Sequence, residues 1–319
     1  MSDLTYMQSI VTGLLQGVTE LFPVSSLGHS VLVPAVIGGS WKHLVTESAS
    51  STSEQSPYLA FIVALHVATA GALLVFFRSD WIRIIRALAV SLRSRTVTTS
   101  DERLAWLLII GTIPVGLTGF LLEHTFRTLF AKPLAAALFL TLNGVILLAG
   151  ERLRRNAEAR RAHPVPTARS GDADADGIIE SHGMVVAERR GLDRLAYREA
   201  GVIGLFQTFA LFAGISRSGI TMVGGLLRGL DHEDAARFSF LLATPVILAA
   251  GLLKLPTLAG SAGSHIHGQV IVGMLAAGTA AYLSVRFLTN YFETRTLTPF
   301  AVYCLVVGGL ATLRFGIGG

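Results

Sequence analysis

The chain has 319 residues and a formal net charge of +5, with 15% charged and 51% hydrophobic residues. Its mean hydropathy of +0.58 excludes an ordinary soluble domain, in which about a quarter of the residues are charged. The single cysteine, Cys304, excludes an internal disulfide and a thiolate metal cluster. We therefore predict an integral membrane protein built from helices. The N-terminus lacks the basic region and cleavage site of a signal peptide, so its first apolar stretch is expected to remain in the mature protein.

Six apolar runs approach or reach the ~20 residues that cross a hydrocarbon core. In chain order they are Tyr58 to Phe77, Leu104 to Leu122, Pro133 to Gly150, Phe238 to Leu253, Gly268 to Val285 and Thr296 to Leu313. Arginines cluster after the first and the third run, which predicts that those loops are cytoplasmic. Residues 39–57, 123–132 and 256–267 and both termini then lie outside. Because the basic residues are sorted by loop, we predict no nucleic-acid partner.

Residues 151–196 form the one clear linker, with charge runs, prolines and small polar residues but no sustained periodicity. This composition favours a disordered or loosely ordered segment between a first unit, residues 1–150, and a second unit, residues 197–319. An acidic stretch within it imitates the start of a calcium loop, but Gly183 stands where the bidentate Glu belongs. A solvated acidic tip is therefore the favoured interpretation.

Two segments outside the six runs, residues 4–38 and 198–230, match each other at an offset of 191 residues. GLLQGVTELFPVSSLGHS, from residue 13, aligns with GLFQTFALFAGISRSGIT, from residue 204. The identical pairs are Gly13/Gly204, Leu14/Leu205, Gln16/Gln207, Ser25/Ser216 and Gly28/Gly219. Each segment is a short apolar arm, a breaker and a second short arm, followed by three of the runs. We predict an all-α membrane protein with six transmembrane helices and two re-entrant helical hairpins in an inverted repeat.

The two breaks predict helix ends near the bilayer midplane. Pro23 is expected to stop the first arm, and Ser25 or Ser26 to cap the second. Gly214 is expected to break the other hairpin, whose second helix opens at its own serines. Two helix N-termini that approach from opposite sides favour an anion, and the planar guanidinium of Arg217 suits phosphate oxygens. The pattern predicts a phosphate site.

Further polar residues in the apolar segments have both structural and functional interpretations. Gln16 and Glu20 share a helix face and either bond helices together or belong to the site. A carboxylate within the membrane is costly, which favours a functional role for Glu20. His29 lies three residues after Ser26, so both side chains can face one point, although a lone histidine is also common in packing. His66, alone in the first run, is interpreted as structural.

The motifs QGVTELFPVSSLGH and AGISRSGIT, followed by FSFLLATP, resemble the signature segments of the undecaprenyl-diphosphate phosphatase family, the bacitracin-resistance membrane proteins of bacteria. The resemblance extends from residue 4 to the C-terminus, apart from the linker and the outer loop at 40–57. It implies hydrolysis of a polyprenyl diphosphate lipid to undecaprenyl phosphate and inorganic phosphate, which recycles the carrier for peptidoglycan synthesis. It also implies the bacterial cytoplasmic membrane, a site open to its outer face, and a divalent cation, Mg²⁺ or Ca²⁺. A homodimer is left open.

By position, the resemblance assigns catalytic roles to Glu20, Ser26, His29 and Arg217, and substrate contacts to Gln16, Ser25, Ser216, Ser218 and Thr221. Glu20 is also the expected metal ligand. The chain departs from the family pattern at Gln16, where a glutamate is usual, and at Ala213, where a proline is usual. An amide oxygen coordinates a cation with less charge, so the first departure weakens a two-carboxylate metal site.

Several alternatives remain open. The attacking group is Ser26, His29 or a water that His29 activates, and some of the serines serve only as helix caps. A polyprenyl-phosphate flippase or transporter has the same broken helices and inverted repeat. A membrane acid phosphatase with a histidine nucleophile shares pieces such as SSLGH and SRSG, but the rest of its pattern is absent from the sequence.

Overall fold

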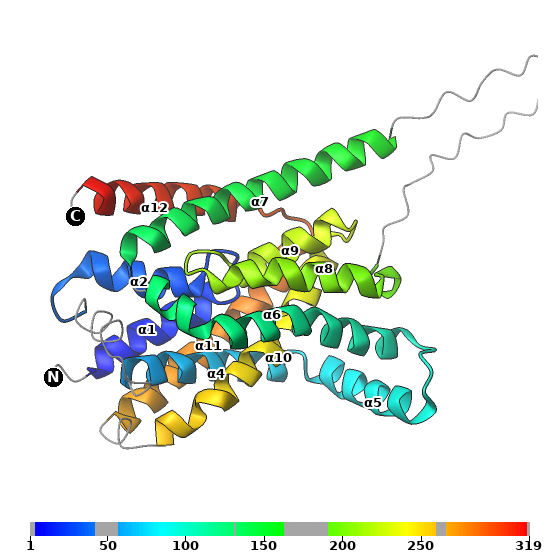
Figure 1. The fold of residues 1–319 in the computed structure, drawn as a ribbon, viewed down its shortest axis with the longest axis horizontal. Helices are drawn as coiled ribbons and strands as arrows, with labels where there is room; N and C mark the ends of the chain where they lie inside the picture. The colour runs from blue at the N-terminus through cyan, green and yellow to red at the C-terminus, as the bar shows by residue number, and fades with distance from the viewer. Residues whose placement is uncertain (1–3, 42–56, 131, 163–190, 260–265, 318–319) are drawn as a thin grey trace, which may run out of the picture.

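The computed structural model of the chain describes residues 4–41, 57–130, 132–162, 191–259 and 266–317. These residues form helices, and no strand occurs among them. Most of the helices run along the long axis of the molecule (Figure 1). The predicted all-helical fold is confirmed.

The long helices account for the apolar runs. α4 (Pro57–Phe76) meets α5 (Arg78–Ser94) at a bend of 85°. The other long helices are α6 (Ser100–Phe130), α7 (Pro133–Ala162), α10 (His232–Ala259), α11 (His267–Phe292) and α12 (Thr298–Ile317). Within the described residues, these five are long and apolar enough to cross a membrane, and the bent pair α4–α5 adds a sixth if it counts as one span. The chain is a multi-pass membrane protein.

Among the described residues, four α-helices have 14 residues or fewer and are too short to cross. They are α1 (Tyr6–Thr19), α2 (Ser26–Ile37), α8 (Tyr197–Thr208) and α9 (Arg217–Leu227). Even the longest, with 14 residues, falls short of a hydrocarbon core of about 30 Å at a rise of about 1.5 Å per residue. α1 and α2 form one broken hairpin; α8, the 3-10 turn η2 (Phe209–Leu211) and α9 form the other. The hairpins start at opposite ends of the molecule, and their tips meet near its middle (Figure 1).

In both hairpins the second helix is capped in the same way. The Oγ of Ser25 caps α2 by accepting a hydrogen bond from the Gly28 N–H at 3.2 Å. The Oγ of Ser216 caps α9 by accepting one from the Gly219 N–H, also at 3.2 Å. Gly214, in the second tip, has a φ of +115°, which favours glycine because a side chain would clash there. The predicted caps and the predicted break at Gly214 are confirmed.

Each hairpin packs its first helix against a long helix from the other half of the chain. α1 packs against α11, and α8 packs against α6. At the first crossing, a Cβ on Gly13 would overlap the carbonyl oxygen of Gly273. At the second, a Cβ on Gly204 would overlap the carbonyl oxygen of Gly111. The glycine identity between the two segments therefore has a packing cause, since small residues let helix backbones approach closely.

α7 runs past the predicted end of the first unit. Residues 151–162 of the predicted linker are helical rather than loosely ordered. Glu151 is 1% exposed, and its Oε2 lies 2.9 Å from the Nε2 of His232 at the start of α10. A buried contact of this kind stabilises the extension of the helix, which composition alone did not indicate. α8 is preceded by the 3-10 turn η1 (Leu192–Arg194), and residues 163–190 of the linker lie outside the described residues.

Candidate active site

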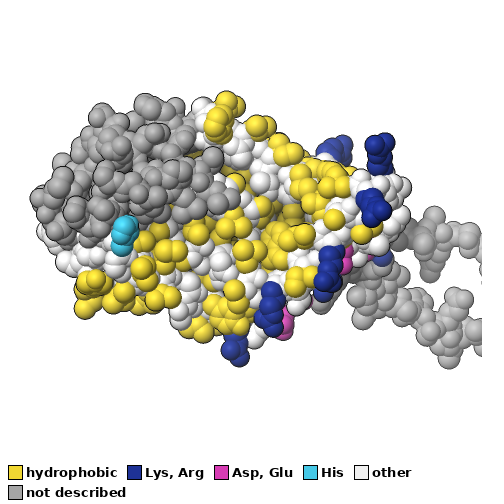
Figure 2. Space-filling view, turned by 90° about the horizontal axis from the view of Figure 1, so that it is seen from below, with side chains coloured by type: hydrophobic (Ala, Val, Ile, Leu, Met, Phe, Trp, Pro, Cys, Tyr) yellow, Lys and Arg dark blue, Asp and Glu magenta, His cyan; other side chains and the backbone are white. Residues whose placement is uncertain are grey.

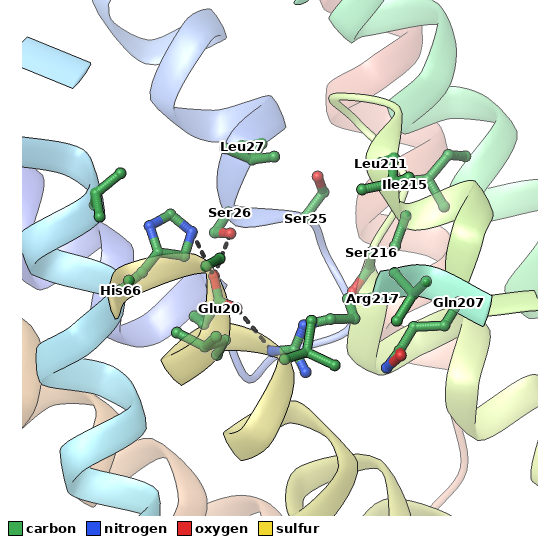
Figure 3. Close-up of a pocket in the computed structure, with 17 residues that line it drawn as sticks. Glu20, Ser25, Ser26, Leu27, His66, Gln207, Leu211, Ile215, Ser216 and Arg217 are labelled. Atoms are coloured by element: carbon green, nitrogen blue, oxygen red, sulfur yellow. Dashed lines mark hydrogen bonds and ion pairs between the residues drawn. The ribbon is translucent and has the colours of Figure 1, made fainter. Parts of the chain in front are cut away.

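A cavity of about 230 Å³ lies beside the point where the hairpin tips meet (Figure 3). Its polar lining consists of Glu20, Ser25, Ser26, His66, Gln207, Ser216 and Arg217. The remaining wall is apolar and comes mainly from α4, α6, η2 and α10, with residues such as Val63, Val115, Leu211 and Ala250. A cavity with a polar end and apolar walls suits an amphipathic ligand.

The Glu20 carboxylate joins the two hairpins. It directly follows α1 and is 6% exposed. Its Oε1 accepts a hydrogen bond from the Arg217 Nη2 at 2.7 Å. Its Oε2 accepts one from the Ser26 hydroxyl at 2.5 Å and one from the Gln16 Nε2 at 2.9 Å. Four of the predicted site residues are thus in direct contact, and a buried carboxylate requires partners of this kind.

Ser26 is the first residue of α2, and the tip of the hairpin holds it in place. The preceding residue, Ser25, has a φ of +71°, which is uncommon for a residue other than glycine. Its hydroxyl oxygen also accepts a hydrogen bond from the Gly214 N–H of the other tip at 3.1 Å. These contacts fix the N-terminus of α2 at the cavity, where the Ser26 hydroxyl donates to Glu20. Strained backbone of this kind clusters at functional sites.

His29 is turned away from Ser26. Its Nδ1 lies 2.7 Å from the Ser25 carbonyl oxygen, and its Nε2 lies 2.8 Å from the hydroxyl of Tyr303 on α12. His29 does not line the cavity. The structure therefore separates the two side chains that the spacing along the helix was expected to bring together, and the partner of the Ser26 hydroxyl is Glu20.

The predicted residues of the second hairpin have different surroundings. Ser216 lines the cavity. The hydroxyl of Ser218 lies 3.1 Å from that of Ser216 and donates to the Phe22 carbonyl oxygen at 3.2 Å, which closes one tip onto the other. Thr221 is 1% exposed, and its hydroxyl has no hydrogen-bond partner in the described part of the chain. Neither Ser218 nor Thr221 lines the cavity.

His66 belongs to the site, in contrast to the structural role expected from the sequence. Its Nε2 lies 3.3 Å from the Glu20 Oε2, and its Nδ1 lies 2.8 Å from the Ile62 carbonyl oxygen. Its ring lines the cavity beside Ser26 (Figure 3). The sequence did contain an indication of this role, because His66 is an ionisable residue within an apolar span, and such residues are functional by default.

Sequence reasoning also left out Gln207 and Asn143. Gln207 on α8 is fully buried and lines the cavity; its signal was the repeat match to Gln16. Asn143 on α7 bridges the tips, because its Nδ2 donates to the Pro23 carbonyl oxygen at 3.0 Å and its Oδ1 accepts from the Ser216 N–H at 2.9 Å. Asn143 is a single polar residue in a long apolar helix, so no spacing pattern in the sequence indicates that it bridges the two tips.

The donors at the cavity can be tested against a divalent cation. Among the described residues, no group of three or more His, Cys, Asp or Glu side chains is arranged to hold a metal ion. Glu20 supplies one carboxylate at the cavity, and the buried Oε1 of Gln16, which contacts Glu20 but does not itself line the cavity, has no hydrogen-bond partner among the described residues. Mg²⁺ is commonly held by one or two carboxylates together with substrate phosphates. These residues therefore fit a cation that a bound phosphate compound helps to ligate.

The fold and the cavity define a class: a multi-pass helical membrane protein with an internal cavity whose polar end and apolar walls suit an amphipathic ligand. The family model described as "Bacitracin resistance protein BacA" matches residues 9–310. The chain belongs to this family.

Curated relatives match the chain over nearly its whole length. It is 68% identical to "Undecaprenyl-diphosphatase 2" of Frankia alni, over 99% of this chain and 100% of that protein. It is 57% identical to "Undecaprenyl-diphosphatase" of Mycolicibacterium paratuberculosis, over 97% of this chain and 96% of that protein. It is 51% identical to "Undecaprenyl-diphosphatase 1" of Frankia casuarinae, over 99% of this chain and 100% of that protein.

Proposed function

We propose that this chain is a phosphatase of the bacterial cytoplasmic membrane that hydrolyses undecaprenyl diphosphate to undecaprenyl phosphate and inorganic phosphate. The names of the relatives and the family description support this activity. The observation that carries the mechanism is the hydrogen bond of 2.5 Å from the Ser26 hydroxyl to Glu20 inside a cavity with apolar walls. Hydrolysis recycles the lipid carrier for peptidoglycan synthesis and confers bacitracin resistance.

Binding of the diphosphate begins at Arg217. Its Nη2 is bonded to Glu20, while its buried Nη1 has no hydrogen-bond partner among the described groups. That free N–H group and the N-termini of α2 and α9 are suited to phosphate oxygens. They also offset the charge that develops on the transferring group.

In the chemical step, the Ser26 Oγ attacks the terminal phosphorus, and Glu20 accepts the hydroxyl proton. The bond from phosphorus to the bridging oxygen breaks, and undecaprenyl phosphate leaves with the proton from Glu20. Water then attacks the phosphoserine, Glu20 transfers a proton from the water to the Ser26 Oγ, and inorganic phosphate is released. His29 holds α2 against α12 through Tyr303 in this scheme and does not attack.

A divalent cation, Mg²⁺ or Ca²⁺, fits this scheme as a partner of the substrate. Glu20 and the Gln16 Oε1 would hold it. When bound, it would supply positive charge that neutralises the phosphate oxygens.

The activity is tested by phosphate release from undecaprenyl diphosphate by the purified protein in detergent. We expect turnover by the wild type, a strong reduction by a chelator, and recovery on addition of Mg²⁺ or Ca²⁺. Absence of phosphate release by folded protein would contradict the proposal and favour a lipid transporter.

We also propose six transmembrane helices and two re-entrant hairpins in an inverted repeat, with residues 1–150 and 197–319 as its halves. The matching caps and the two glycine crossings support this arrangement. On the face in Figure 2, Lys and Arg gather toward one end beyond a broad hydrophobic area, which supports a cytoplasmic position for that end. A homodimer stays a prediction that cross-linking in membranes tests.

The orientation is tested by cysteine labelling in a Cys304→Ser background. We expect an impermeant thiol reagent to label Ser51→Cys in intact cells, and Ser170→Cys only after permeabilisation. Labelling of the second variant but not the first would invert the topology.

A further inference from the structure

The side chain of Gln207 is buried in the wall of the cavity. It is 0% exposed, and neither its Nε2 nor its Oε1 has a partner among the described residues. Its repeat equivalent, Gln16, donates to Glu20 at 2.9 Å. A buried amide without partners is costly, and a hydrophobic side chain of similar shape would avoid that cost. Packing therefore does not explain a glutamine at this position.

The amide of Gln207 adjoins the same space as the free guanidinium N–H groups of Arg217. Both residues line the cavity, and the buried Arg217 Nη1 also has no partner in the described part of the chain. Figure 3 shows Glu20 and Ser26 on one side of Arg217 and Gln207 on the other. The unpaired groups of Arg217 and Gln207 thus extend the polar lining of the cavity away from the Ser26 hydroxyl.

A diphosphate has two phosphate groups, and their order in the cavity follows from this arrangement. The terminal phosphate must lie against Ser26, whose hydroxyl attacks it, and Arg217 lies between Ser26 and Gln207 (Figure 3). The phosphate that carries the lipid then lies on the Gln207 side. Ala210 and Leu211 of η2, the turn that follows α8, line the cavity and provide apolar surface for the start of the hydrocarbon chain.

We propose that Gln207 binds the lipid-linked phosphate, the leaving group of the reaction, by donating hydrogen bonds from its Nε2 to phosphate oxygens. This inference rests on the proposed phosphatase activity. An amide is neutral, so it holds the leaving phosphate without forming the tight ion pair that would slow product release. Gln207 is thereby a substrate-binding residue contributed by the second hairpin.

Binding of the two products tells whether Gln207 contacts the lipid-linked phosphate or the terminal phosphate. Undecaprenyl phosphate carries only the lipid-linked phosphate group, and inorganic phosphate corresponds only to the terminal group. For Gln207→Met we expect kcat/KM for undecaprenyl diphosphate to fall about tenfold, the effect of one lost hydrogen bond. Binding of undecaprenyl phosphate, measured directly, should weaken by about the same factor. Inhibition by inorganic phosphate should not change. The melting temperature should stay equal or rise, since an unpaired buried amide has been removed.

Gln207→Glu provides a second test if the methionine variant does not fold, since its negative charge should repel the same phosphate and weaken undecaprenyl phosphate binding at least as much. Gln269→Met on α11, a glutamine that does not line the cavity, is the matched control and should behave as wild type. Wild-type affinity of either folded Gln207 variant for undecaprenyl phosphate would overturn the inference. Equal weakening of both products would overturn it too, because Gln207 would then contact the terminal phosphate. Absence of turnover by the wild type would refute the proposed phosphatase activity. The direct measurement of undecaprenyl phosphate binding would still test whether Gln207 contacts the lipid-linked phosphate.

Discussion

In both broken hairpins, a serine caps the second helix and a glycine lets the first helix approach a helix of the other half. Ser25 and Ser216 make their capping bonds at the same distance, 3.2 Å. Gly13 and Gly204 each lie against a backbone carbonyl of another helix. These residues recur because both hairpins must solve the same two geometric problems, ending a helix and crossing another closely.

The charged side chains and the attacking hydroxyl do not recur, although the Gln16/Gln207 pair does. At the repeat offset, Glu20 corresponds to Leu211, and Ser26 corresponds to Arg217. The first hairpin thus supplies the carboxylate and the hydroxyl, while the second supplies the cation. The comparison teaches that the two hairpins share their caps and their close helix crossings, whereas the site is asymmetric because a diphosphate is attacked at only one of its two phosphorus atoms.

Ser26→Ala tests the first hairpin as the source of the attacking group, and the largest effect is expected here. Removal of the hydroxyl should lower phosphate release on the order of a thousandfold or more, because no nucleophile remains beside Glu20. Ser30→Ala, one turn further along α2 and outside the cavity lining, is the matched control and should stay active. Substantial turnover by Ser26→Ala would shift the attack to His29 or to water.

Arg217→Lys tests the second hairpin as the phosphate clamp. Lysine keeps the charge but loses the two-pronged geometry, so we expect turnover to fall about a hundredfold with an unchanged melting temperature. Arg217→Ala should be at least as inactive. If Arg217 were only a counter-ion for Glu20, the lysine variant would keep near-normal turnover, and the alanine variant would lose thermal stability together with activity.

His66→Leu tests the role of His66, which lies on α4 and belongs to neither hairpin. We expect kcat to fall about tenfold, because Glu20 loses one of its hydrogen-bond donors but keeps those from Ser26, Arg217 and Gln16. His66→Gln retains a donor and should lose less activity. Equal turnover by wild type and His66→Leu, measured side by side, would return His66 to the structural role.

Substitution of the two capping serines should have the smallest effects, and these effects should be on the stability of the fold. Ser216→Ala should lower the free energy of unfolding by about 1 kcal/mol, the usual contribution of an N-cap. Ser25→Ala should lower it slightly more, since the Ser25 hydroxyl oxygen also accepts from Gly214. Thermal unfolding in detergent measures both, and Ser216→Thr should restore the cap. Loss of stability in only one hairpin would break the proposed symmetry of the backbones.

Sequence alone determined the features that depend on local interactions. Hydropathy marked the long helices, and the serines of the two tips marked where the short helices begin, because a cap bonds a backbone group only three residues away. The repeat itself was readable because its glycines and its capping serines serve the backbone in both hairpins. The continuation of α7 past residue 150 was not predictable, since Glu151 is stabilised by His232, 81 residues along the chain.

Tertiary structure alone decided which polar side chains share the site. Glu20 meets Arg217 across 197 residues, and His29 turns to Tyr303 across 274 residues, so helical spacing could not reveal either partner. His66 looked like a single polar residue in an apolar run, and Gln207 was marked only by its repeat match to Gln16; the packing of α4 and α8 beside the two tips places both residues at one cavity. Capping is a contact along the chain, whereas a site for a charged ligand within a membrane requires groups from several helices to converge, which packing decides.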